Sequence, residues 1–516
     1  MKKIIYIYTL PFVALIFLLG ACTEGFEEMN TNPNLPISVP LANHLAGTIV
    51  SLDGNMVISD GAITINTRYV AGRWGAAYNP NNITTFQNTT SSNWAGYYTN
   101  LIDLNTIIEK ATEQEAWNML AAALTTRAEL TQVFTDRFGE MPYTEAAKAG
   151  EGILRPKFDT QESIYKEIIK DLKTAADYFK AGHKDPIGSV DPLFGGDVVQ
   201  WKKFCNSLRL RVAIRISNVD QTGATAIISE VLGKPADYPI TQSYKDAAEV
   251  TYGGEGTPWT IGYWYWMNLL EHSGPTFYLV DMLKNNNDPR LEHIIGKAPA
   301  PGPDGEYHGT TEIGRHPNNT IPQMSYFNKN YYLVNNTTGP NIHLRHSETC
   351  FTLAEIYLRG LHPGGDAAAK QAYEAGIYSS MKELSIMGEA KPFLIRTATP
   401  AIEDAQIAAY IANQPFATWG GSNNEKLKKI WNQKWLAMVF MQNEPWAEMR
   451  RTDTPNWGIA RNSYYEGHNR DPFRLPYPAE EERMNSENSK TYFERQKAGD
   501  YLWGGQLWWD KRTGVK

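Results

Sequence analysis

The residues best suited to bind a ligand form a short aromatic cluster in the middle of the chain. Within residues 254–268, GEGTPWTIGYWYWMN, the cluster comprises Trp259, Tyr263, Trp264, Tyr265 and Trp266. The CH groups of a sugar ring pack on flat aromatic faces, and nearby polar side chains bind its hydroxyls. In a strand or in a helix, some of these rings must face outward or meet a loop. The cluster therefore predicts a sugar-binding platform, although the same rings could instead fill a seam between helices and loops.

Two further segments combine rings with amide side chains. Trp74 and Tyr78 lie in the loop 68–87, and Tyr326 begins another such stretch. The accompanying side chains are Arg73, Asn79, Asn81, Asn82, Asn328, Asn330, Tyr331 and Tyr332. Loops on a rigid scaffold carry a large share of binding residues, so Trp74, Tyr78 and Tyr326 join the predicted site. The fold could also bury Trp74.

The sequence contains none of the common catalytic signatures. H-E-x-x-H, G-x-S-x-G, G-x-x-x-x-G-K-[ST] and Cys-x-x-Cys are all missing. A glycosidase needs only two carboxylates, and 56 acidic residues leave such a pair open. His272, His343, His346 and His362 lack the spacing of metal ligands. We therefore predict no catalytic residue, no metal and no cofactor. The net charge of −7 argues against nucleic acid as a partner.

The N-terminus has the pattern of a signal peptide. Lys2 and Lys3 precede an apolar run from Ile4 to Leu19, which is shorter than the roughly 20 residues that span a membrane. The run ends in LGAC, the lipobox pattern that signal peptidase II cuts before the cysteine. We predict a signal peptide at 1–21 and acylation of Cys22, which would hold the chain at a bilayer. An ordinary secretory signal is the alternative.

The mature chain divides into a short tether and one large body. Residues 22–40 include an acidic stretch and TNPNLP, a composition typical of a linker. We assign 41–516 to the binding domain. No second apolar run in the sequence approaches membrane-spanning length. The two remaining cysteines, Cys205 and Cys350, are expected to be buried free thiols.

Hydrophobic periodicity predicts a mainly α fold. Apolar residues recur every three to four positions in two helical hairpins, at about 94–138 and 160–219, the second capped by Asp159 or Thr160. Further helices are predicted at about 347–361, 366–384, 403–413 and 423–443. Paired helices of this size suggest tetratricopeptide-like repeats. Irregular segments at 62–92, 221–345 and 444–510 would form a loop layer over this frame.

Four stretches together resemble the SusD/RagB family of nutrient-binding outer-membrane lipoproteins. They are FTDRFGEMPYTEAA (134–147), WKKFCNSLRLRVAIRIS (201–217), KIWNQKWLAMVFMQNEPWAEMRRTDTP (429–455) and FRLPYPAEE (473–481). Their order and spacing extend the resemblance along almost the whole mature chain. Turn and surface chemistry accounts for Pro142-Tyr143, Arg450 and Arg451 as scaffold residues.

The resemblance implies tetratricopeptide-like helix pairs, four in number, with a loop-rich ligand face. It also implies a partner, a SusC-like TonB-dependent outer-membrane transporter, to which such a protein passes oligosaccharides or peptides. No motif fixes the family's ligand-binding positions onto the aromatic segments of this chain.

The sequence thus predicts a surface-exposed lipoprotein of the outer membrane that binds an oligosaccharide and catalyses no reaction. Capture of peptides by the same architecture is the main alternative. A carbohydrate-active enzyme and a lid that binds no solute are the others. The outward orientation rests on the resemblance alone.

Overall fold

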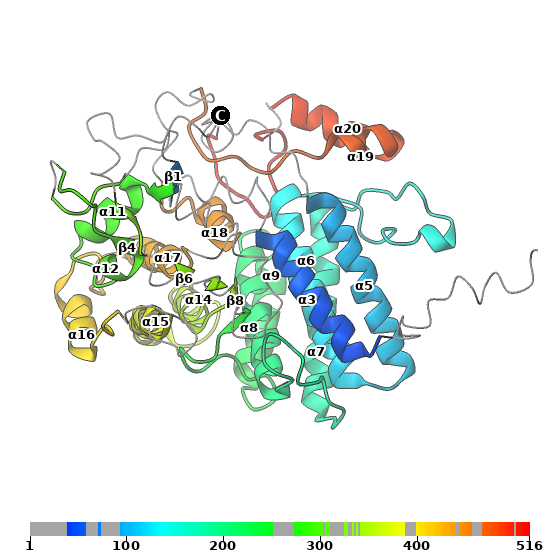
Figure 1. Cartoon of the computed structure of the whole chain (residues 1–516), viewed down its shortest axis with the longest axis horizontal. Helices are drawn as coiled ribbons and strands as arrows, with labels where there is room; N and C mark the ends of the chain where they lie inside the picture. The colour runs from blue at the N-terminus through cyan, green and yellow to red at the C-terminus, as the bar shows by residue number, and fades with distance from the viewer. Residues whose placement is uncertain are drawn as a thin grey trace, which may run out of the picture.

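The fold was analysed in a computed structural model of the whole chain. It describes residues 39–57, 71–73, 93–250, 273–302, 305–309, 325–328, 333–334, 337–338, 341–387, 399–439, 441, 443–456, 467–499 and 502–515. Helices make up most of these residues, as expected from the sequence. They form two groups that meet near the middle of the molecule (Figure 1).

The first group packs in chain order. Its helices are α3 (Leu41–Val57), α5 (Asn93–Glu113), α6 (Trp117–Phe138), α7 (Gln161–Ala181), α8 (Val198–Ile216) and α9 (Gln221–Gly233). Each helix contacts the next, so both predicted hairpins are confirmed. The hydroxyl of Thr160 caps α7 by accepting a hydrogen bond from the amide of Ser163 at 3.2 Å. Asp159 instead accepts hydrogen bonds from the amides of Tyr143 and Thr144 after α6.

The second group continues the frame. Its main helices are α14 (His346–Leu358), α15 (Gly365–Met387), α16 (Asp404–Asn413), α17 (Asn423–Ala437) and α18 (Glu444–Thr452). Helix α14 packs on α15 and α17 and also contacts α8, which joins the two groups (Figure 1). The prediction of one helix over 423–443 is wrong, because α17 ends at Ala437 and α18 starts anew. Pro445 in the first turn of α18 explains this start, since proline cannot donate the hydrogen bond that a helix interior requires.

Two segments predicted to be irregular contain further helices. Within 221–345 lie α9, α11 (Phe277–Lys284) and α12 (Leu291–Ile294). Within 444–510 lie α18, α19 (Ala479–Met484) and α20 (Ser486–Lys497), and a short 3-10 helix, Ala149–Glu151, lies elsewhere. In α9, Asp220 accepts a hydrogen bond from the Gly223 amide at 2.8 Å, and Ala224, Ile228 and Val231 are buried. The glycines and threonines of this segment hid that periodicity.

The strands in the described part of the chain are short and form antiparallel pairs. They are β1 (Ala71–Arg73) with β3 (Ser273–Pro275), β2 (Ala248–Val250) with β8 (Asn341–Leu344), β4 (Ile295–Gly296) with β5 (Tyr326–Phe327), and β6 (Leu333–Val334) with β7 (Thr337–Thr338). Each pair joins segments that lie outside the helices. The strands therefore attach connecting segments to one another.

The core of the frame contains charged side chains as well as apolar ones. Arg211 and Arg215 of α8 are both buried. Arg215 bonds to Asp136 at 2.5 Å and to Glu444, while Arg211 bonds to Glu348 at 2.6 Å. These ion pairs connect α8 to α6, α14 and α18. Burying a charge is costly unless it is paired, so the pairs specify how the helices meet.

The motif residues near the C-terminus have the scaffold role predicted for them. Arg450 donates to the backbone carbonyls of Asp136 and Phe473 at 2.6 and 2.8 Å. Arg451 pairs with Glu355 at 2.7 Å, and the guanidinium helps to hold the pKa of that buried carboxyl down, at about 2. Cys205 and Cys350 are free and buried, which confirms that prediction as well.

Candidate ligand-binding site

The pairing of β1 with β3 joins two strands that border predicted binding segments in the sequence. In this antiparallel pair Arg73 lies opposite Ser273. Trp74 follows Arg73 in the chain, and Trp266 precedes Ser273 by seven residues. The chain after Arg73 and the chain before Ser273 therefore meet the two strands at the same end. We call β1 and β3 together the strand ribbon.

The third predicted segment reaches the same region. Strand β5 lies beside β3 and pairs with β4, so that Tyr326 is opposite Gly296. The ribbon and β5 thus connect three segments that are far apart in the sequence. The sequence selected the first segment for its rings and the other two for rings with amides, and it contained no signal that the strands beside them pair.

The individual predicted side chains cannot be placed against this ribbon. Trp74, Tyr78, Trp259, Trp264, Tyr265 and Trp266 lie outside the described residues, as does Cys22. Tyr326 is described through its backbone in β5. These residues stay predictions.

Strand β5 is fixed to the frame by packing and hydrogen bonds. Phe327 is fully buried in a cluster with Leu283 of α11, Ile294 of α12 and Trp435 of α17. The next residue, Asn328, donates its backbone amide to the Ile294 carbonyl at 2.9 Å and its side-chain amide to the Glu292 carbonyl at 2.7 Å. A segment that leaves this strand therefore starts from a rigid base.

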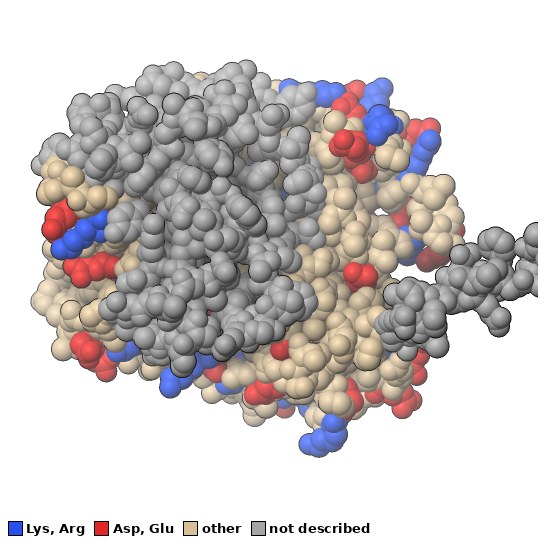
Figure 2. All heavy atoms as spheres, in the orientation of Figure 1, with Lys and Arg blue, Asp and Glu red and all other residues tan. Residues whose placement is uncertain are grey.

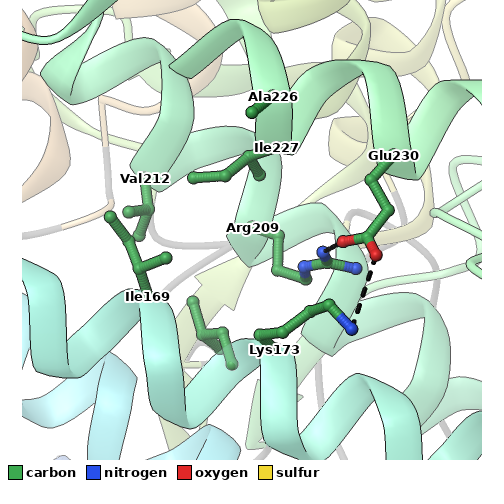
Figure 3. Close-up of a pocket in the computed structure, with 8 residues that line it drawn as sticks. Ile169, Lys173, Arg209, Val212, Ala226, Ile227 and Glu230 are labelled. Carbon is green, nitrogen blue, oxygen red and sulfur yellow. Dashed lines mark hydrogen bonds and ion pairs between the residues drawn. The ribbon is translucent and has the colours of Figure 1, made fainter. Parts of the chain in front are cut away.

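One cavity in the described structure lies between α7, α8 and α9 and has a volume of about 390 Å³ (Figure 3). Its apolar wall includes Ile169, Val212 and Ile227. Lys173 and Arg209 both reach Glu230, the lysine at 3.4 Å, and close one end with ion pairs. The charged groups satisfy one another, and the rest of the wall offers only apolar contact.

A second cavity has a different, more polar lining. It measures about 580 Å³ and lies between the segment 242–244, the start of α14, α15 and α16. Its lining residues are Gln242, Ser243, Tyr244, His346, Glu374, Ala375, Tyr378, Ser379, Asp404, Ile407, Ala408 and Ile411. Sequence reasoning did not select these residues as a site, because they come from four separate segments. The pair of tyrosines in polar surroundings was the only signal available.

Basic and acidic side chains lie next to one another on part of the described surface. In Figure 2, Lys and Arg side chains lie beside Asp and Glu over α19 and α20, as in the pair Lys497–Glu482 at 2.5 Å. Within the described ranges, no group of three or more His, Cys, Asp or Glu side chains is arranged to hold a metal ion. Among the helices described, none combines the length and apolar composition that a membrane crossing requires.

A family comparison identifies the class of protein. The model of a SusD-like family, described as "Starch-binding associating with outer membrane", matches residues 48–478. This match spans most of the chain, so the chain belongs to the SusD-like family. The resemblance inferred from the four sequence stretches is confirmed. No curated protein matches the sequence.

Solved structures agree on the fold. A chitin-binding protein, 24% identical, superposes with a TM-score of 0.74 over 92% of this chain and 100% of its own. A SusD homolog from Bacteroides fragilis, 21% identical, gives the same TM-score and the same coverage. A SusD-like protein from Bacteroides thetaiotaomicron, 23% identical, gives a TM-score of 0.69 over 92% of this chain and 99% of its own. The predicted tetratricopeptide-like helical fold is confirmed.

Proposed function

We propose that this protein is a surface glycan-binding lipoprotein that captures oligosaccharides and passes them to a SusC-like TonB-dependent transporter of the outer membrane. The observation that carries the proposal is the strand ribbon, with β5 beside it. The rings of 68–87 and 254–268 flank this ribbon in the sequence, and Tyr326 belongs to β5. Their rings, with the amides of 68–87 and of the stretch after Tyr326, make the combination that a sugar requires. Membership of a family described as starch-binding and associated with the outer membrane supports the same ligand class and location.

Binding without chemical turnover is part of the proposal. Titration calorimetry of the purified protein against a panel of oligosaccharides should give heat of binding with at least one of them. Chromatography of the incubated sugars should recover them uncut. Cleavage of a glycosidic bond would contradict the proposal in favour of an enzyme. Retention of peptides from a protein digest, with no sugar retained, would favour peptide capture.

The anchor and the partner are tested separately from the ligand. Acylation of Cys22 would hold the body at the membrane through the linker 22–40. Cys22→Ala should release the protein from the outer-membrane fraction and leave its oligosaccharide affinity unchanged. Affinity purification from detergent-solubilised membranes should recover a barrel transporter with the wild-type protein. Wild-type membrane retention of Cys22→Ala would contradict the lipid anchor.

A further inference from the structure

The polar cavity at α15 and α16 has the components of a second binding site. Its volume of about 580 Å³ falls within the roughly 300–1,000 Å³ typical of small-molecule sites. Helices α15 and α16 form two of its walls, and the segment 242–244, which leads into β2, forms a third. Walls made of packed helices hold their side chains in place before a ligand arrives, which reduces the entropy lost on binding.

Two tyrosine rings meet in this cavity. Tyr244 and Tyr378 lie with their ring centroids 6.2 Å apart and their planes at 67°. Both side chains are partly exposed, so their rings are accessible from the cavity. Two rings at a steep angle offer a corner in which the CH face of a ring-shaped ligand can pack. Ile407 and Ile411 of α16 supply apolar surface nearby.

Hydrogen-bonding groups surround the rings. Gln242 and Ser243 supply an amide and a hydroxyl from one wall, and Glu374 and Asp404 supply carboxylates from α15 and α16. The Tyr378 hydroxyl donates to Asp404 at 3.3 Å, which links the two groups. Carboxylate, amide and hydroxyl oxygens together suit a ligand that has several hydroxyl groups.

The charges in this cavity are already balanced. Asp404 pairs with Lys382 at 2.6 Å, and Glu374 lies 3.8 Å from Lys370. Lys382 also lies over the Tyr378 ring at 5.6 Å, in the place that a cationic ligand would take. Burial lowers the pKa of His346 to about 4, so that its ring is neutral at physiological pH. The balance favours a neutral ligand over an anion or an amine.

We propose that the cavity formed by residues 242–244, α15 and α16 is a second saccharide site, which takes one neutral sugar ring or the end of a chain. It is separate from the strand ribbon, because α15 and α16 lie at the lower left in Figure 1 and β1 lies near the top. A protein with two such sites would hold a long glycan at two points. The resulting gain in apparent affinity depends on the chain spanning both sites.

Isoleucine methyl groups allow this cavity to be observed directly. Ile407 and Ile411 line it, whereas Ile169 and Ile227 line the apolar cavity between α7 and α9. Methyl NMR spectra of the full-length protein with both Trp264→Ala and Trp266→Ala should be recorded in the presence of maltose, cellobiose or N,N′-diacetylchitobiose. We expect at least one sugar to shift the Ile407 and Ile411 signals and to leave Ile169 and Ile227 unchanged. Using this variant separates the result from the proposed ribbon site.

Substitutions at Tyr244 make the test specific. Tyr244→Ala should lower the affinity for the sugar that causes the shift about fivefold to tenfold, because it removes one ring face. Tyr244→Phe keeps the ring and should keep wild-type affinity. The Ile169 and Ile227 signals report whether each variant is folded. Unmoved Ile407 and Ile411 signals with all three sugars would overturn the proposal, as would shifts caused only by a peptide digest or an unchanged affinity in folded Tyr244→Ala.

Discussion

The helical frame and the strand ribbon are stabilised by different means and serve different purposes. At the frame's centre, Arg215 contacts acidic side chains from two other helices, and it is completely buried. The ribbon consists of two three-residue strands, from which the aromatic segments lead away. The sequence stretches that identify the family belong largely to the frame. The family can therefore be recognised from residues that need never touch the ligand, while the residues proposed to choose the ligand carry no shared motif.

The largest effect is expected from breaking the buried charges of the frame. Arg215→Met should lower the free energy of unfolding by about 3–5 kcal/mol, because it removes the positive charge that pairs with both buried carboxylates, Asp136 and Glu444. Urea unfolding would measure the loss. Ligand affinity of the folded fraction should not change. The exposed pair Lys490–Glu494, 3.9 Å apart, provides the control, and Lys490→Ala should have an effect below about 1 kcal/mol.

The next largest effect is a pH dependence of the free energy of unfolding, which arises in the frame. Burial raises the pKa of the Glu383 carboxyl of α15 to about 7, whereas an unfolded glutamate titrates near 4.3. The protonated carboxyl therefore adds stability that is complete below about pH 4.3 and is lost as the pH rises through about 7. Glu383→Gln cannot ionise and should avoid this loss.

The measurement for Glu383 is urea unfolding of wild type and variant at pH 5 and at pH 8. From pH 5 to pH 8, the unfolding free energy of the wild type should fall by about 2–3 kcal/mol relative to that of Glu383→Gln. Oligosaccharide affinity of the folded wild type should stay level over the same range. An unfolding difference independent of pH would show that Glu383 does not titrate there.

In the aromatic segment that precedes β3 in the sequence, substitutions should affect binding and leave stability unchanged. Trp264→Ala or Trp266→Ala should weaken oligosaccharide binding by about 1–2 kcal/mol if the ring forms part of the platform. Trp419, a partly exposed ring on the frame that donates to Asp366 at 3.2 Å, is the matched control. Trp419→Ala should bind normally in calorimetry. Wild-type affinity in a stably folded Trp264→Ala or Trp266→Ala would assign that ring to the core.

The smallest expected effect tests the scaffold role of the Pro142 turn. The hydroxyl of Tyr98 in α5 donates to the Pro142 carbonyl at 3.1 Å. Tyr98→Phe removes this hydrogen bond and should cost about 1 kcal/mol of stability with no change in affinity. Tyr178→Phe, in which the ring stacked on Trp117 is kept, is the control. A loss of oligosaccharide affinity in Tyr98→Phe would place this turn at the ligand rather than in the scaffold.

Much of the frame could be predicted from the sequence because its signals are local. Apolar spacing located both hairpins, and Thr160 marked the start of α7. The break between α17 and α18 was missed, although Pro445 in the first turn of α18 is a local signal for a new helix. The burial of Arg211 and Arg215 could not be predicted from local sequence signals. Their partners Asp136, Glu348 and Glu444 lie far away in the chain.

The sites depend on contacts between distant segments, which single-sequence patterns do not reveal. Ring and amide content selected the segments around Trp74, Trp264 and Tyr326, but the pairing of β1 with β3 and the position of β5 beside β3 could not be read from it. The polar cavity was missed for the same reason. Tyr244 and Tyr378 are far apart in the sequence, and neither is part of an aromatic cluster.

A double-mutant cycle across the ribbon tests the central claim most directly. Calorimetry would compare one bound oligosaccharide with the wild type, Trp74→Ala, Trp264→Ala and the double variant. If the ribbon brings both segments to one ligand, each single change should weaken binding, and the double variant should deviate from the sum of the two effects by about 0.5 kcal/mol or more. Wild-type affinity in a stably folded double variant would contradict the claim that the ligand is bound at the ribbon.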